Sequence, residues 1–320
     1  MITKHVAGAL FGLFLLAACS SVVGGATPEA ACDQFTNTIC KKIKTCQPET
    51  FNFAYTDLAT CVARTTIACK STLAAKGTAD TPSSLQACTG AYDALSCDRL
   101  VATHNPPTEC KPLVGPLADG SSCQEDSQCK STYCKFGTNA ACGACGVRVG
   151  AGQTCAVTKD CEYGLVCASA VVGTTVTSSC VRPGVAGASC GSGAPCERGL
   201  YCNSGTAGTT GTCALTRKAG ESCTGGDCDS LKLLACNTTT KVCQTYKTAA
   251  AGSACGLSGA DYTLCQGLGA TCATAGTSLS GTCTPGLADG AACTTTTGAS
   301  CQFPATCVSG VCTLPTACGG

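Results

Sequence analysis

The chain shows three successive patterns of apolar and polar residues, and each predicts a different kind of element. The first is an uninterrupted apolar run of eleven residues from Val6 to Leu16, preceded by Lys4 and His5. A membrane-spanning helix needs about 20 apolar residues, so this run is too short to cross a bilayer and has the length of a signal-peptide core. We therefore expect residues 1–18 to be a targeting segment that the mature protein lacks.

The second pattern is a helical periodicity between residue 29 and about residue 100. Pro28 and Glu29 come just before a stretch, ending at Cys46, whose apolar and cysteine positions 32, 35, 39, 40 and 43 share one helical face. Similar faces occur over residues 57–75 and over residues 82–95. We therefore expect three helices within a cysteine-bearing helical domain at residues 29–111.

Cysteines in the first two predicted helices have the spacing of rungs across a helical hairpin. In two antiparallel helices, residues that face each other have numbers with a constant sum. Cys40 with Cys69 and Cys46 with Cys61 come close to one sum, so we predict these two disulfides. The spacing does not decide how four further cysteines are bonded, namely Cys32, Cys88, Cys97 and Cys110.

The third pattern is a repeat without apolar periodicity. From residue 120 onward the motif Gly-x-x-Cys occurs six times. Its glycine and cysteine positions are Gly120/Cys123, Gly152/Cys155, Gly187/Cys190, Gly220/Cys223, Gly252/Cys255 and Gly290/Cys293. Further cysteines follow each motif, and the stretch before the fourth ranges from four residues, 308–311, to twelve, 168–179. Such variation is typical of hairpin loops, so we expect six tandem modules of short two-stranded β-ribbons at residues 120–320, after a stiff proline-bearing linker at residues 112–119.

Composition explains why such a chain needs cross-links. The 320 residues include 35 cysteines and 39 glycines but no Trp, and aromatic residues make up only 4%. This chain can bury little large apolar surface, and disulfides are the usual remedy. A cytosol would keep the thiols reduced, so we expect maturation in an oxidising compartment. The predicted fold class is small disulfide-rich, with a disulfide-bonded helical domain, tandem ribbon modules and little other regular secondary structure.

The first apolar run ends in Leu16-Ala17-Ala18-Cys19, which resembles the lipobox of bacterial lipoproteins. The resemblance implies cleavage after Ala18 and lipid on Cys19, which makes residues 1–18 a lipoprotein signal peptide. Without Cys19 the chain has 34 cysteines, an even number that can pair completely. Residues 19–28 then form a short tether. Ser20 is compatible with the outer membrane or cell surface as the location, and secretion is the alternative.

The repeats resemble the Dickkopf N-terminal, colipase-like cysteine-rich module in their cysteine spacing, their leading glycine and the Gly-Leu-x-Cys segments that end at Cys167 and Cys202. The chain is similar in particular to myxobacterial lipoproteins that join a helical segment to tandem modules, and the likeness covers nearly all of the mature chain. It implies bonds from the first to the third and from the second to the fourth cysteine. The implied disulfides in modules two and three are Cys155–Cys167, Cys161–Cys180, Cys190–Cys202 and Cys196–Cys213.

Two cysteines are left over by this pattern. The first module carries an extra cysteine in the segment from Cys142 to Cys145, and Cys318 stands alone near the end. Cys142 and Cys318 either bond to each other or belong to pairs that the repeat misassigns. A C-x-x-C segment can bind zinc or carry out redox chemistry. A zinc site requires a second such pair, and thioredoxin chemistry requires a βαβ unit, and the sequence has neither. We expect structural disulfides, with no metal and no cofactor.

Residues for catalysis are scarce. The histidines are His5, which leaves with the signal peptide, and His104, which lies in a proline-rich stretch. The carboxylates at positions 125, 126, 160, 162, 227 and 229 accompany cysteines and are typical of solvated turns. We therefore expect no catalytic residues and no enzyme activity. Asn237 begins an N-glycosylation sequon, which has little weight in a bacterial protein.

These observations predict a non-catalytic, lipid-anchored cell-surface protein that acts as a structural or multivalent binding scaffold, with modules that project outward from the membrane. The expected partners are the membrane, through the lipid, and an extracellular protein or glycan. A net charge of +1 does not point to nucleic acid. The alternative is a secreted or surface protease inhibitor, for which Lys159 and Arg182 are the candidate anchors.

Overall fold

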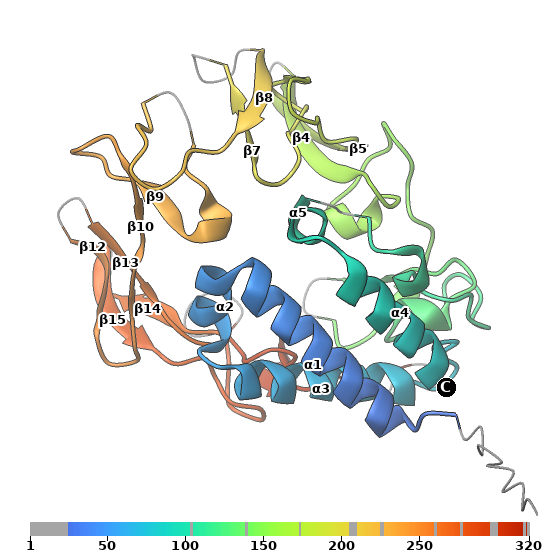
Figure 1. Ribbon diagram of the computed structural model, residues 1–320. Helices are drawn as coiled ribbons and strands as arrows, with labels where there is room; N and C mark the ends of the chain where they lie inside the picture. The colour runs from blue at the N-terminus through green and yellow to red at the C-terminus, as the bar shows by residue number, and fades with distance from the viewer. Residues whose placement is uncertain are drawn as a thin grey trace, which may run out of the picture.

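The structure is a computed structural model, and it describes residues 25–102, 105–137, 140–172, 174–204, 210–224, 227–258, 261–275, 278–294, 300–315 and 318. The predicted signal peptide, the lipid-bearing Cys19 and His104 lie outside the described residues. Figure 1 shows that the later part of the chain curves around a group of helices formed by its first part.

Helices occupy the described residues between Pro28 and Ala102. They are α1 (Pro28–Cys46), α2 (Pro48–Tyr55), α3 (Leu58–Ala74), α4 (Pro82–Ala94) and α5 (Cys97–Ala102). Side chains cap three of them, because Thr27 accepts from the backbone N–H of Ala30, Asp57 accepts from that of Thr60, and Thr81 and Ser84 form a capping box. All three predicted helices are present, and α2 and α5 are additional.

Two disulfides between α1 and α3 differ from the predicted rungs. The structure contains Cys32–Cys69 and Cys40–Cys61 in place of the predicted Cys40–Cys69 and Cys46–Cys61. Cys46 lies six residues after Cys40, or about 120° away around α1, so it does not share the face that meets α3. The two helices share instead an eight-residue spacing of cysteines, and both bonded pairs have the same sum of residue numbers.

Two further disulfides complete the helical segment. Cys46 bonds to Cys97 at the start of α5, and Cys88 of α4 bonds to Cys110 in the 3-10 helix η1 (Thr108–Cys110). These bonds attach the short later elements to α1 and α4.

Six modules follow, and they repeat one disulfide scheme. With the extra Cys142 of module one left out of the count, the first cysteine of each module bonds to the third and the second to the fourth. The bonds are Cys123–Cys134 and Cys129–Cys145, Cys155–Cys167 and Cys161–Cys180, Cys190–Cys202 and Cys196–Cys213, Cys223–Cys236 and Cys228–Cys243, Cys255–Cys272 and Cys265–Cys283, and Cys293–Cys307 and Cys301–Cys312. We number the modules one to six in this order. The four pairs implied for modules two and three are present.

The leading glycine has the same role in every module. Its backbone N–H donates to the carbonyl of the fourth cysteine at 2.7–2.9 Å. Its φ lies between +80° and +85° in all six copies, which is a left-handed backbone conformation that residues with a Cβ rarely adopt. The repeated glycine therefore closes each module on itself, which accounts for its recurrence in the sequence.

The strands of the modules are short. They are β1 (Ser122–Cys123), β2 (Cys134–Lys135), β3 (Gly143–Cys145), β4 (Val166–Val172), β5 (Thr175–Val181), β6 (Ser189–Cys190), β7 (Leu200–Asn203), β8 (Gly211–Leu215), β9 (Leu234–Cys236), β10 (Cys243–Thr245), β11 (Lys247–Ala249), β12 (Ala254–Ser258), β13 (Asp261–Cys265), β14 (Thr271–Thr274), β15 (Ser280–Thr284), β16 (Thr306–Val308) and β17 (Val311–Thr313). Three 3-10 helices, η2 (Asp126–Gln128), η3 (Thr158–Asp160) and η4 (Ser230–Lys232), lie between them.

Module five departs from the predicted two-stranded ribbon. Its strands form a five-stranded sheet in the order β11-β13-β12-β15-β14, and modules one and three have three-stranded sheets. Strand β11 lies in the connection from module four and pairs in parallel with β13. Gly256, at φ +85°, lets β12 approach β15 so closely that a Cβ there would lie 2.1 Å from the Leu279 carbonyl oxygen. The sheet thus depends on a connection and a glycine outside the repeat.

The modules lie around the helices and do not extend away from them in a row. Thr50 of α2 donates to the Leu231 carbonyl of module four at 2.7 Å, and Gly267 of module five donates to the Phe53 carbonyl at 2.9 Å. Arg64 of α3 makes a bidentate ion pair with Asp289 in the connection to module six at 2.8 Å. Figure 1 shows the resulting arc from module one, past modules two to five, and back to α3.

A disulfide closes this arc. Cys142 of module one bonds to Cys318, across 176 residues of sequence. The buried Gln128 of η2 reinforces the junction, since its amide donates to the Lys76 carbonyl at 2.7 Å and to the Cys318 carbonyl at 3.1 Å. The first module, the end of α3 and the C-terminal segment therefore meet at one place.

An arginine joins modules one and two. The Arg148 guanidinium lies 4.5 Å from the ring centre of Tyr133 and 4.6 Å from that of Tyr163, and it pairs with Asp126 at 2.9 Å. Its side chain is 10% exposed. Stacking between two rings together with an ion pair fixes the angle between the modules.

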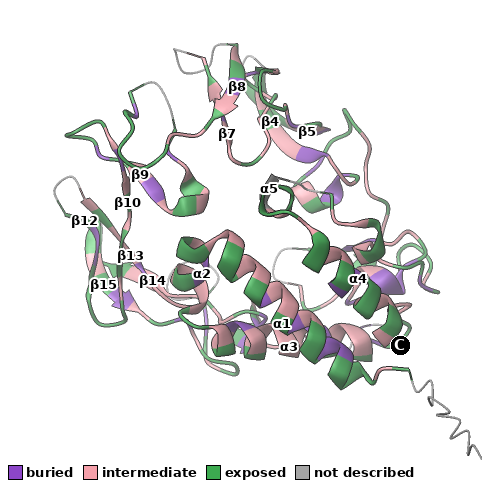
Figure 2. Ribbon diagram, viewed as in Figure 1, coloured by how far each residue is buried: buried purple, intermediate pink, exposed green. Residues whose placement is uncertain are grey.

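The buried residues form several small clusters. Each of the modules one, two, four, five and six has a cluster made chiefly of its own cysteines, and a further cluster in the helices centres on Phe51, Cys40 and Cys61. Figure 2 shows the buried residues in short separate stretches along the arc of modules and in the helices. Among the described residues, no helix has the length and apolar character to cross a membrane.

Candidate functional site

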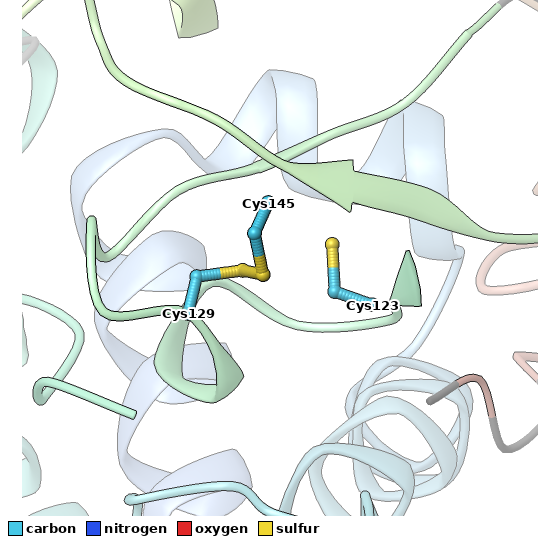
Figure 3. A group of neighbouring side chains, drawn as sticks. All are labelled: Cys123, Cys129 and Cys145. Carbon is cyan, nitrogen blue, oxygen red and sulfur yellow. A yellow bond between two sulfur atoms is a disulfide. The ribbon is translucent and has the colours of Figure 1, made fainter. Parts of the chain in front are cut away.

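Groups of three cysteine sulfurs recur in the modules, and their geometry resembles a metal site at first sight. In module one the sulfurs of Cys123, Cys129 and Cys145 lie within 4.8 Å of one another (Figure 3). Cys129 is bonded to Cys145, and Cys123 is bonded to Cys134. Metal binding by cysteine requires thiolates, which these oxidised sulfurs are not. The groups are crossings of two disulfides.

The predicted C-x-x-C segment is divided between two bonds. Cys142 is bonded to Cys318, and Cys145 is bonded to Cys129. The two sulfurs of the segment therefore do not form a dithiol pair with each other.

Two of the carboxylates that accompany the cysteines, Asp126 and Asp160, hold local structure. Asp126 accepts from the Cys134 backbone N–H at 2.8 Å and pairs with Arg148. Asp160 accepts from the Tyr133 hydroxyl and from backbone N–H groups in its own turn. Burial alone would raise the pKa of Asp160, but these hydrogen bonds outweigh it and hold that pKa below its ordinary value. Both side chains are occupied by structural partners.

The two candidate inhibitor anchors have different surroundings. Lys159 lies in the 3-10 helix η3, and its ammonium pairs with Asp126 at 3.2 Å, so it does not lie in an extended loop. Arg182 is exposed and precedes the buried Pro183. The long 168–179 segment forms the regular hairpin of β4 and β5, whose tip carries the exposed Val171 and Val176.

The sequon asparagine is not available as an acceptor of sugar. Asn237 is 8% exposed, its amide donates to Gln244 at 3.0 Å, and its oxygen accepts from two backbone N–H groups at 2.9 Å. Attachment of a glycan to this nitrogen would break these bonds.

The described residues contain an apolar cleft of about 310 Å³ in the helical segment. Phe35 of α1 and Tyr92 of α4 form one wall, with their rings edge to face and their centres 6.3 Å apart. Leu73 of α3 and Leu85 of α4 add aliphatic surface. A cleft of this size and character suits an apolar group of a ligand or partner.

Disulfides hold the cleft open and in shape. Cys69 and Cys88 are buried in its lining, and their bonds to Cys32 and Cys110 tie α1 to α3 and α4 to η1. The capping box of Thr81 and Ser84 fixes the start of α4 beside it. Because covalent bonds set the walls, the cleft is preorganised and loses little entropy when it is filled.

Charged groups lie at the rim of the cleft. Asp80, Glu109 and Lys111 border it, and the Lys111 ammonium also lies 5.3 Å from the ring centre of Tyr163 in module two. Burial raises the pKa of Tyr92 in the wall. The cleft therefore has an apolar interior, a neutral phenol and a charged border, which is the usual composition of a binding site.

Sequence reasoning identified residues of this cleft without identifying the cleft. The periodicity placed Phe35 on the apolar face of the first predicted helix, and Leu85, Cys88 and Tyr92 lie within the third predicted helix at residues 82–95. The available signal was the presence of two aromatic residues on these helical faces in a chain with only 4% aromatic residues. Leu113 and Val114, which follow Pro112 of the lining in the sequence, are exposed.

Comparisons with protein families, with curated proteins and with solved structures find no match to this chain.

Proposed function

We propose that the protein is a non-catalytic, lipid-anchored cell-surface scaffold that binds partners on a rigid, disulfide-closed frame. The observation that carries the proposal is the closure of the frame, because every cysteine of the described residues is in a disulfide and Cys142–Cys318 joins the first module to the last segment. Preorganised surfaces bind with a small entropy cost. Asp126 and Asp160 serve local structure, which favours a binding role over a catalytic one.

We further propose that residues 29–111 are a helical domain and that the modules belong with the Dickkopf-type cysteine-rich modules of myxobacterial lipoproteins. Two features support this kinship. One is the bonding of first to third and second to fourth cysteine in all six modules, and the other is the common left-handed glycine.

The helical cleft is the proposed place where an apolar group of a partner binds. A neutral naphthylamine dye, whose fluorescence rises in apolar surroundings, tests this directly on the purified full-length protein. We expect saturable binding that the variant Leu85→Trp abolishes, because the indole would fill the cleft. The matched control is Leu215→Trp, which places the same side chain on a strand where the leucine is 74% exposed.

The chain has no natural Trp, so each variant also carries a single Trp reporter of its own surroundings. We expect blue-shifted emission from Leu85→Trp and water-like emission from Leu215→Trp. Dye binding that both variants leave unchanged would show that the cleft is not the binding site.

The lipid anchor is tested by the variant Cys19→Ala. We expect the natural chain to partition with membranes and to gain the mass of attached lipid, and the variant to lose both. A variant that remains with the membrane would refute the anchor at Cys19.

A protease inhibitor is the second candidate, and the exposed Arg182 is the observation in its favour. Titration of trypsin-like proteases with the protein tests this reading. Stoichiometric inhibition that Arg182→Ala removes would replace the scaffold proposal with an inhibitor.

A further inference from the structure

A second concave site lies where module four meets module five. It has a volume of about 240 Å³, and its lining comes from the β9–β10 ribbon and from strands β11, β12 and β13. Figure 1 shows the ribbon of β9 and β10 beside β12 and β13. Strand β11 continues from module four and pairs with β13 of module five, so backbone hydrogen bonds fix the two walls relative to each other. The site is therefore preformed.

Aromatic and aliphatic groups give the site an apolar face. The rings of Tyr246 and Tyr262 meet edge to face with their centres 6.0 Å apart. Leu257 lies directly across the strand pair from Tyr262, and these two side chains are 40% and 42% exposed. The junction therefore presents an aromatic pair together with a partly exposed leucine.

A chain of hydrogen bonds places polar groups beside this face. The Asn237 amide donates to the Gln244 side-chain oxygen, which leaves the Gln244 amide to donate to Asp261 at 3.1 Å. The Lys247 ammonium donates to the second Asp261 oxygen. These bonds, that of Lys247 first, hold the pKa of Asp261 below its ordinary value, so its carboxylate stays charged.

The polar groups have hydrogen-bond donors and acceptors that these bonds do not use. Each carboxylate oxygen of Asp261 can accept a further hydrogen bond, and Lys247 has further N–H donors. An acceptor and a donor that adjoin each other match two neighbouring hydroxyl groups, since a hydroxyl both donates and accepts. The C–H face of a sugar ring would meanwhile cover the ring of Tyr262.

Other ligand classes fit less well. A phosphate or sulfate group would meet the Asp261 carboxylate, and like charges at contact repel. A purely apolar group would remove water from Asp261 and Lys247 without replacing its hydrogen bonds. A neutral pyranose can both cover the apolar face of the site and form hydrogen bonds with Asp261 and Lys247.

We propose that the junction of modules four and five is a carbohydrate site, which takes one neutral pyranose of a glycan with its C–H face on Tyr262 and its vicinal hydroxyls on Asp261 and Lys247. The inference rests on the proposed function as a surface binding protein, because it names the ligand class for one of its surfaces. It does not depend on the helical cleft.

The test measures binding of methyl glycosides of glucose, galactose, mannose and N-acetylglucosamine to the purified full-length protein by saturation-transfer NMR. We expect at least one of these neutral sugars to bind. The variant Tyr262→Ala removes the stacking face, and Asp261→Asn removes the charged acceptor, so each should weaken binding by about tenfold or more.

Two control variants separate the site from general effects. Tyr262→Phe keeps the ring and should bind within about threefold of the natural protein, a loss below 1 kcal/mol. Phe136→Ala removes another exposed aromatic residue, in module one, and should leave binding unchanged. Intact masses that retain every disulfide show that the variants are folded.

Absence of binding by all four sugars, or binding that survives both Tyr262→Ala and Asp261→Asn, would overturn the inference. The dye and membrane experiments above remain informative in that case, because they concern the cleft and Cys19. Failure of the sugars with success of those experiments removes this site alone.

Discussion

Single side chains connect parts of this protein that are far apart in the sequence. Arg64 of α3 is the clearest case, since it binds both carboxylate oxygens of Asp289 and also donates to the carbonyls of Gln302 and Phe303. A guanidinium can serve several acceptors in one plane, which an ammonium cannot do. Nothing near Arg64 in the sequence marks this role, because its partners lie more than 220 residues away.

The variant Arg64→Lys keeps the charge but loses the planar array of donors. We expect it to lower the free energy of unfolding by about 1–3 kcal/mol and to speed amide hydrogen exchange in module six. Arg182→Lys is the matched control, because Arg182 is exposed. Equal exchange rates in both variants would show that Arg64 does not hold module six to α3.

The alkaline limit of stability is also set by single residues. Burial, helped by the hydrogen bond to Asp160, raises the pKa of Tyr133 well above its ordinary value. The folded protein thus holds this proton more tightly than the unfolded chain does. Its contribution to stability is complete below about pH 10 and declines as the pH rises toward the folded-state pKa.

We therefore expect the thermal midpoint to fall as the pH is raised above about 10. Burial also raises the pKa of Tyr55, Tyr92 and Tyr163, so tyrosinate absorbance should show several late groups with Tyr133 the last of them, and Tyr133→Phe should remove that last step. An unchanged titration curve in the variant would contradict the assignment.

At the scale of elements, local chemistry was more predictable than pairing. Caps and apolar faces identified α1, α3 and α4, because these signals lie within a few residues of each helix. The predicted disulfides between α1 and α3 had the wrong register. Helix α2 places the turn between α1 and α3 nearer the start of the chain than the prediction assumed. The shared eight-residue cysteine spacing held the correct answer. The five-stranded sheet could not be predicted, because strand β11 belongs to no repeat.

The repeated glycine gives a prediction at this scale. Gly252→Ala would force a Cβ into a backbone at φ +85°, although there is open space around it. We expect a loss of about 1–2 kcal/mol in stability, and faster hydrogen exchange confined to module five. Gly90→Ala is the matched control, because its Cβ also meets open space but it lies inside helix α4.

The control should gain about 0.5–1 kcal/mol, since alanine is the better helix former. Differential scanning fluorimetry measures both changes. A stable Gly252→Ala protein would mean that the positive φ is not required there.

At the scale of the whole molecule, the arc of modules is closed by contacts that composition and spacing do not reveal. The cysteine count allowed Cys142 and Cys318 either to bond to each other or to belong to other pairs that the repeat misassigns. In the structure they bond to each other. Hydrogen bonds between α2 and modules four and five hold the modules around the helices. The positions of the residues that line the cleft and the module junction both depend on this arrangement of modules around the helices.

The double variant Cys142→Ser with Cys318→Ser removes the closure. We expect the other sixteen disulfides to form, since each module bonds internally, and the cleft to keep its dye binding. The radius of gyration in X-ray scattering should increase, and exchange should rise in the last segment. Chain entropy sets an upper bound of about 5 kcal/mol on the stability lost. An unchanged radius would show that the noncovalent contacts suffice.

The bond between Cys142 and Cys318 also changes what a protease can do to this protein. A cut in a connection between two later modules opens the ring but releases nothing, because the two pieces remain joined through module one. Shedding of a fragment needs two cuts or a reductant together with one. A protein exposed to extracellular proteases can therefore be nicked once and still keep all its modules attached.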